Sequence, residues 1–119
     1  MAAPNLINPT VLTSKNGQFL LTTSDQAVVA NAAASGTVVK ITSVYIANIH
    51  ATDPQAVTVT LNDNGTGRIL LNGGEVPVNC TLVVIDKEAP INLEENDSLL
   101  VKAGNANALN AIVSYEVMG

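Results

Sequence analysis

Apolar and polar residues alternate with a period of two along much of this chain. In residues 56–62, two valines and a leucine share one face, and threonine and asparagine occupy the positions between them. The same alternation recurs in residues 97–103 and 108–118. It is typical of β-strands that bury one face in a core and turn a polar face toward water.

Residues 37–49 form a longer segment that is apolar on both faces. Strict alternation places Val39, Ile41 and Tyr45 together on one of these faces. Such a strand is either central in its sheet or covered by a neighbour, for example another subunit. A further alternative is a bulge near Thr42 that shifts the alternation by one residue.

One alanine-rich segment, residues 26–34, departs from this pattern. Alanine favours helices, but nine residues without a strong cap form only a marginal helix. We therefore expect a strand over residues 26–30 followed by a loop, and a short helix is the alternative.

Clusters of glycine, asparagine, aspartate and proline separate the apolar segments at short intervals. Residues 15–17 and 72–74 are expected to form turns, and the pair Asn64-Gly65 favours a two-residue type I′ hairpin turn. Strands at such spacing predict an all-β fold, an antiparallel β-sandwich of jelly-roll type with about eight strands. The expected strands, of which two short ones should merge or fail, lie near residues 9–14, 18–22, 26–30, 37–49, 55–62, 67–72, 80–86, 90–93, 97–103 and 108–118.

The first residues of the chain combine prolines with apolar side chains. Pro4 and Pro9 disfavour regular pairing, because proline lacks the donor that a β-ladder needs. The apolar side chains that still need burial are Leu6, Ile7, Val11 and Leu12. They indicate either an extended arm that lies across another surface or an edge strand of the chain's own domain. We expect an arm over residues 1–15, with these four as interface residues, and a single β-sandwich domain over residues 16–119.

The amino-acid composition excludes some classes of function and favours others. The chain has 119 residues, of which 47% are hydrophobic, 13% charged and 3% aromatic, with a formal net charge of −5. So apolar a chain does not stay disordered, and five scattered cations with few aromatic rings do not suit a nucleic-acid binder. Charged residues usually make up about a quarter of a globular domain. The shortage of charge therefore predicts that like subunits or a larger scaffold cover much of the surface.

The cysteine, histidine and serine residues of the chain do not predict an active site. Cys80 is the only cysteine, so no internal disulfide or thiolate zinc site forms, and we expect it to be a small buried side chain. The absence of disulfides fits assembly in a reducing compartment. His50 is the only histidine and lies in a stretch that reads as a turn, and no nucleophile-elbow motif surrounds a serine. We therefore predict no enzyme, no catalytic residue and no cofactor.

The sequence gives equally little support for metal binding, sugar binding or a membrane partner. The acidic stretches 86–88 and 94–97 lack the spacing of a known calcium loop, so we expect solvated turns and no metal site. Sugar binding requires exposed rings, whereas Phe19, Tyr45 and Tyr115 fall in strands where we expect them to be buried. The start of the chain does not read as a signal peptide, and the apolar runs are too short to span a membrane, so no membrane partner is expected.

Four stretches, residues 37–48, 76–82, 90–99 and 109–116, carry motifs of strands and turns. They resemble small β-sandwich structural proteins of tailed bacteriophage virions, of the capsid decoration or cement type. In such proteins a Leu-Glu-x-x-Asp-Ser-Leu turn leads into the last strands, which end in a Val-Ser-Tyr motif. This chain has both motifs, with Asn96 where glycine is more usual, and asparagine accepts the same left-handed conformation. The first 35 residues have no counterpart in this pattern.

The resemblance implies a non-enzymatic virion protein that is made in the host cytoplasm and forms homotrimers. Its partner would be the major capsid protein or another virion protein, and its most familiar role is decoration of the capsid surface. There it bridges neighbouring capsomers and stabilises the shell through many weak contacts. A tail, neck or fibre-associated module of the same virion is the alternative, and a carbohydrate- or receptor-binding module is a remote one.

Overall fold

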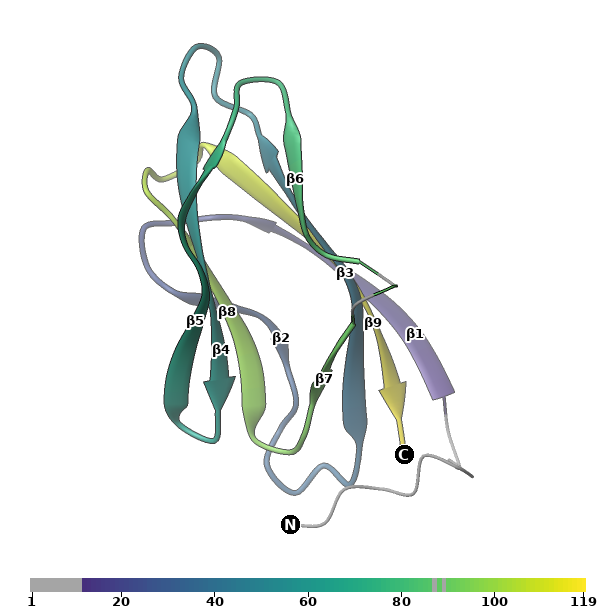
Figure 1. Ribbon diagram of the computed structural model, residues 1–119. Coiled ribbons are helices and arrows are strands. Elements are labelled where there is room, and N and C mark those ends of the chain that lie inside the picture. The colour runs from purple at the N-terminus through teal and green to yellow at the C-terminus, as the bar shows by residue number, and fades with distance from the viewer. Residues whose placement is uncertain (1–11, 87, 89) are drawn as a thin grey trace.

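Nine strands make up the described part of the chain in the computed structural model, which covers residues 12–86, 88 and 90–119 (Figure 1). Within these residues there is no helix. The strands of the first half are β1 (Leu12–Leu20), β2 (Gln26–Ala30), β3 (Val38–Asn48) and β4 (Gln55–Asp63). Those of the second half are β5 (Thr66–Val76), β6 (Thr81–Ile85), β7 (Ile91–Leu93), β8 (Asp97–Ala103) and β9 (Leu109–Met118).

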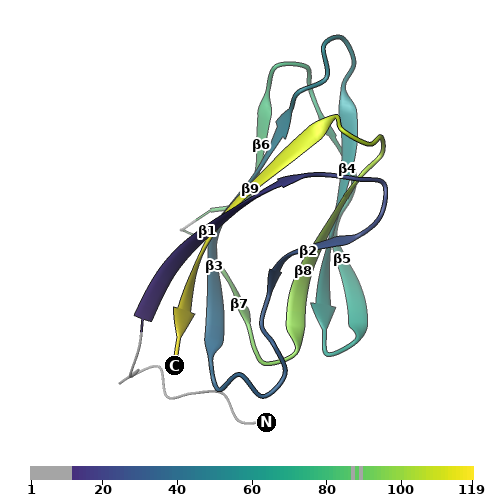
Figure 2. The same ribbon diagram turned by 180° about the vertical axis from the view of Figure 1, so that it is seen from behind.

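The strands form two antiparallel sheets that pack face to face, as the opposite views in Figures 1 and 2 show. The five-stranded sheet has the order β1-β9-β3-β6, with β7 also paired to β3. The four-stranded sheet has the order β2-β8-β4-β5. Because β6 and β7 share one edge of β3, the nine strands fill eight positions, and their order is that of a jelly roll. The predicted all-β jelly-roll sandwich is therefore confirmed.

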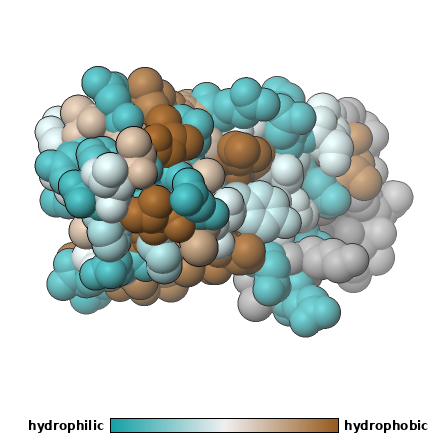
Figure 3. Space-filling view, turned by 90° about the horizontal axis from the view of Figure 1, so that it is seen from above, coloured by the Kyte–Doolittle hydropathy of each residue, from teal (hydrophilic) through white to brown (hydrophobic). Residues whose placement is uncertain are grey.

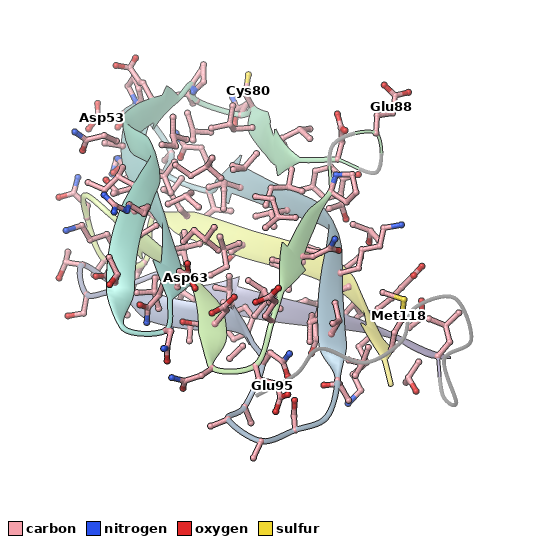
Figure 4. All side chains as sticks on the ribbon, turned by 60° about the horizontal axis from the view of Figure 1, so that its bottom comes forward. Asp53, Asp63, Cys80, Glu88, Glu95 and Met118 are labelled. Atoms are coloured by element: carbon pink, nitrogen blue, oxygen red, sulfur yellow. The ribbon has the colours of Figure 1, made fainter. Side chains whose placement is uncertain are left out.

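Aliphatic side chains from both sheets fill the space between them (Figure 4). The alternation in β4 has the predicted effect, since Val57 and Val59 are buried while Thr58 between them remains partly exposed. The largest fully buried side chains are Leu21, Ile41, Ile46, Leu93, Leu99 and Leu109. Apolar transfer of this kind, about 25 cal/mol per Å² removed from water, drives the two sheets together.

The strand β3 contains the bulge that its two-sided apolar pattern suggested. Its register against β9 shifts between Ile41 and Ser43. Before the shift Val39 and Ile41 face the core, and after it Val44 and Ile46 do. Tyr45 thereby moves to the outer face of the five-stranded sheet, so the prediction that it is buried was wrong.

Local turn chemistry was predicted correctly at several positions. Asn64 and Gly65 both have positive φ, 50° and 94°, as the β4–β5 hairpin requires. Asn96, with φ of 68°, adopts the left-handed conformation in which glycine is more usual. The alanine-rich segment forms the strand β2 followed by a loop, as expected.

Two predicted turns lie inside strands instead. Residues 15–17 belong to β1, where nine consecutive pairs with β9 override the local turn preference. Gly17 has a packing role there, because a Cβ atom would lie 3.0 Å from Phe19 Cε2 and 3.3 Å from Val113 Cγ2. Residues 72–74 form a bulge of β5, in which Gly73 has φ of +63° and donates its N–H to Thr58 Oγ1 at 3.1 Å.

A buried asparagine fixes each end of the sandwich. Asn48 is 6% exposed; its Nδ2 donates to the carbonyl oxygens of Asp53 and Val76, and its Oδ1 accepts the N–H of His50. At the other end Asn31, 4% exposed, donates in the same way to the carbonyl oxygens of Thr37 and Leu93. These side chains replace the backbone ladder where the strands end, so the loops hold defined positions.

Candidate interaction face

The outer face of the five-stranded sheet carries a row of exposed apolar side chains. Ile112 of β9 lies opposite Tyr45 of β3, and Tyr45 lies opposite Val83 of β6. Leu20 of β1 is diagonal to Ile112, because its direct partner is Asn110. The exposed fractions of these four side chains are 41%, 38%, 49% and 47% in the order named. We call Leu20, Ile112, Tyr45 and Val83 the apolar row.

The strands around the apolar row carry almost no charge on this face. Toward the other end of the sheet the next positions are Asn16, Ser114 and Ser43, all neutral. The outer positions of these described strands include two charged residues, Lys40 and Glu116, which lie directly opposite each other. Their opposite signs balance each other, so these two positions of the paired strands add no net charge to a covered surface.

A depression of about 680 Å³ adjoins the apolar row. Tyr45 lines both features, and Asp86, Glu88 and Glu116 give the depression its acidic character. Glu88 projects outward from the segment between β6 and β7 (Figure 4). A basic side chain from a partner fits this position by sign, next to the apolar contacts.

A second, smaller apolar feature lies where the two sheets open between β5 and β6. Leu70, Leu71, Leu82, Val83 and Val84 line a groove of about 240 Å³. Seen from above, hydrophobic side chains reach the surface in several separate groups among hydrophilic ones (Figure 3). Val83 belongs to both the groove and the apolar row, so the two apolar surfaces adjoin at β6.

The interface residues predicted from sequence are partly placed. Leu6, Ile7 and Val11 lie outside the described residues. Leu12 begins β1, is 61% exposed, and lies on the same face of the sheet as the apolar row. Residues 12–15, which belonged to the expected arm, pair with Met118 to Tyr115 of β9.

The sequence pattern does not predict most of the apolar row. It predicts the strands that contain Val83 and Ile112 but not the exposure of either side chain, and it predicts that Tyr45 is buried. One signal for the row was present, namely the second apolar face of residues 37–49, for which a covering subunit was one explanation. Of the other rings, Phe19 and Tyr115 pack against the core as expected.

The single cysteine and histidine have structural settings. Cys80 is exposed in the loop before β6 and projects outward, so its predicted burial was wrong (Figure 4). The loop places it outside the alternation of β6, and its backbone accepts the N–H of Asn48. His50 Nδ1 accepts the N–H groups of Thr52 and Asp53 at 3.2 and 3.1 Å, which organises the predicted turn.

The acidic stretch 94–97 is a structural turn rather than a fully solvated one. Asp97 is buried, its Oδ1 accepts the N–H of Asn64, and its Oδ2 accepts the N–H of Glu94. The carboxylate therefore ties the β4–β5 hairpin to the turn before β8. Across residues 12–86, 88 and 90–119, no group of three or more histidine, cysteine or acidic side chains is placed to hold a metal ion. The same residues contain no helix long and apolar enough to cross a membrane.

The sequence matches no protein-family profile and no curated protein. The fold is similar to a chain in the acidic stable capsid structure of Helicobacter pylori bacteriophage KHP30, with a TM-score of 0.56 and 13% identity over 94% of this chain and 90% of that one. A chain from the structure of Bacillus endospore appendages, disulfide-linked pili, matches with a TM-score of 0.49 and 16% identity, over 91% of this chain and 85% of that chain. At such identities the capsid likeness shows a shared fold.

Proposed function

We propose that this protein is a structural, non-enzymatic component of a tailed-bacteriophage virion that decorates the capsid and bridges neighbouring capsomers. The observation that carries the proposal is the outer face of the five-stranded sheet, which combines the apolar row with a nearly uncharged surface. A lone domain gains nothing from exposing four large apolar side chains across adjacent strands. A flat scaffold that covers them gains buried apolar area at every copy.

Two further observations support this role. The sequence motifs resemble capsid decoration proteins, and a chain of a phage capsid structure has a similar fold. The acidic depression beside Tyr45 suits a basic side chain of the major capsid protein, which would orient each copy on the shell. Contacts of this kind are weak singly, but their repetition over a shell makes release of the whole layer slow.

The proposed assembly on the virion is a homotrimer, with residues 1–11 reaching onto the shell. The apolar side chains Leu6, Ile7 and Val11 would add to the contact made by the sheet face. Deletion of residues 1–11 leaves β1 whole, so we expect weaker attachment with an unchanged melting temperature. A deletion variant that protects particles from heat as well as the full chain does would exclude this use of the arm.

The decisive experiment locates the chain in particles of the phage that encodes it. Particles prepared without the protein are mixed with the purified chain, and a map of the reconstituted particle is determined. We expect density on the capsid surface across joints between capsomers, together with greater resistance to heat. Density confined to the neck, tail or fibres would instead support the alternative structural module, and no density anywhere would refute a virion role.

A further inference from the structure

The strand β1 is an edge strand with an unusually regular free side. It lies at the border of the five-stranded sheet in both views, and among the described residues only β9 pairs with it (Figures 1 and 2). Its nine pairs with β9, from Leu12↔Met118 to Leu20↔Asn110, contain no register shift. The free side therefore presents an uninterrupted row of backbone donors and acceptors.

The other edges are interrupted. The ladders of β2, β5 and β6 each contain a register shift, and β7 has only three residues. Bulges and short strands of this kind prevent an edge from pairing with another chain. Among these edge strands, β1 is the one that has no register shift and is not short. It also contains no proline, so its geometry favours pairing.

The hydrogen-bond phase shows which residues offer their backbone to a partner. Leu21 donates its N–H to the carbonyl oxygen of Leu109 at 2.9 Å, in the same register as the β1–β9 ladder. Antiparallel pairs alternate between bonded and non-bonded, so the odd-numbered residues of β1 bond to β9. The N–H and C=O groups of even-numbered residues, from Leu12 to Leu20, point away from β9.

We propose that β1 pairs antiparallel with β1 of a second copy, about a two-fold axis that passes through Asn16. The strand Leu-Thr-Ser-Lys-Asn-Gly-Gln-Phe-Leu is complementary to its own reverse in this register. Leu12, 61% exposed, lies opposite Leu20 of the second copy, which is 47% exposed. Lys15 lies directly opposite Gly17, so the one charged side chain of β1 has no side chain directly opposite it and is only diagonal to Lys15 of the second copy.

The register shifted by one residue fits β1 less well. A pairing centred one residue earlier places Lys15 opposite Lys15 of the second copy, and like charges directly opposite each other destabilise a sheet. The two-fold arrangement is closed, which stops the strand from adding further chains. It also brings Leu12 of the second copy beside Leu20, so the apolar row continues from one copy into the next. The contact involves only two copies of this chain and does not rest on the proposed virion role. In the proposed trimer, the same contact would connect one trimer to another.

Cysteine cross-linking tests both the contact and its register. All variants carry Cys80→Ser, because Cys80 is exposed and would form its own disulfides. Asn16→Cys places the two thiols in one bonded pair, with Cα atoms about 5.5 Å apart, which suits a disulfide. We expect this variant to oxidise to a covalent dimer about tenfold faster than a variant whose thiols meet only by random collision of two chains.

Ser14→Cys and Gln18→Cys are the matched controls, since both side chains are exposed on the same face of β1 as Asn16. In the proposed register each is separated from its own symmetry mate by four residues, roughly 13 Å. Each alone should therefore form little covalent dimer, whereas a mixture of the two should form the covalent heterodimer. Equal rates for all three single variants, or a faster reaction between positions 14 and 16, would overturn the proposal.

Proline substitution separates strand pairing from loose association. The N–H of Asn16 points outward, so Asn16→Pro removes no bond to β9, while Lys15→Pro removes one and is the destabilised reference. We expect Asn16→Pro to keep a melting temperature near that of the parent chain and to abolish the cross-link between positions 14 and 18. Cross-linking that persists in Asn16→Pro, or capture of a strand from another virion protein by a chain that forms no dimer, would contradict self-pairing.

Discussion

The two sheets share one core but present different faces to their surroundings. On the five-stranded sheet, Ile112, Tyr45 and Val83 lie side by side on three neighbouring strands. The corresponding row of the four-stranded sheet runs Ala27, Leu100, Thr60 and Ile69. A small residue and a threonine flank Leu100, so no two large apolar side chains are adjacent there. Burial inside the sandwich is thus similar for both sheets, and of these two outer rows only the one on the five-stranded sheet is continuous across neighbouring strands.

The largest expected effect comes from a charge placed in the middle of the apolar row. Ile112→Asp would bury a carboxylate against the partner, so we expect attachment to phage particles to weaken by roughly 2–4 kcal/mol. Thr60→Asp is the matched control, because position 60 occupies the corresponding row of the other sheet. Both variants pay a similar strand-propensity cost of about 1 kcal/mol in the free energy of unfolding.

Co-sedimentation with particles measures attachment, and urea unfolding measures stability. Loss of binding in Ile112→Asp alone would support the distinction between the sheets. Equal loss in Thr60→Asp would show that both faces contact the particle, and full binding by Ile112→Asp would remove the apolar row from the proposed interface.

A smaller effect is expected when the ring at the centre of the row is removed. Tyr45 contributes contact area between Ile112 and Val83, so Tyr45→Ala should weaken attachment by about 1–2 kcal/mol. Tyr45→Phe keeps the ring and should bind almost as the parent chain does. If the phenylalanine variant loses as much binding as the alanine variant, the hydroxyl group rather than the apolar surface makes the contact. Titration of labelled protein onto particles gives the comparison.

Replacing the threonine that interrupts the row on the four-stranded sheet should make its outer face resemble that of the five-stranded sheet. Thr60→Ile would join Leu100 and Ile69 into a continuous apolar row, so we expect new self-association worth less than about 1 kcal/mol per contact. Asn62→Ile is the control, since its partners on β8 and β5 are Ser98 and Gly67 and no apolar row forms. Light scattering at rising concentration should separate the two. Identical behaviour of both variants would mean that continuity of the row is not what makes a face adhesive.

Sequence reasoning could predict the inner faces better than the outer ones. The alternation in β4 was sufficient to place Val57 and Val59 in the core, because β4 itself has no extra residue and pairs with β8 in one unbroken register. Tyr45 could not be placed in this way, since the bulge between Ile41 and Ser43 depends on pairing with β9 and reverses every side chain after it. Likewise residues 15–17 have turn chemistry, and only the ladder with β9 makes them a strand. The apolar row is a property of four strands in register, which no single segment encodes.

The smallest expected effect concerns the charged pair on the otherwise neutral face. Lys40 lies directly opposite Glu116, so Lys40→Glu creates a like-charged cross-strand pair and should lower the free energy of unfolding by about 0.5–1 kcal/mol. Lys102→Glu is the control on the other sheet, where the opposing residue is the neutral Thr58. The difference between the two variants should shrink as salt is raised, because counterions screen the like-charged pair at positions 40 and 116. Thermal unfolding at low and high ionic strength measures it, and a difference that does not change with salt would mean that Lys40 stabilises the sheet through packing of its aliphatic stem rather than through its charge.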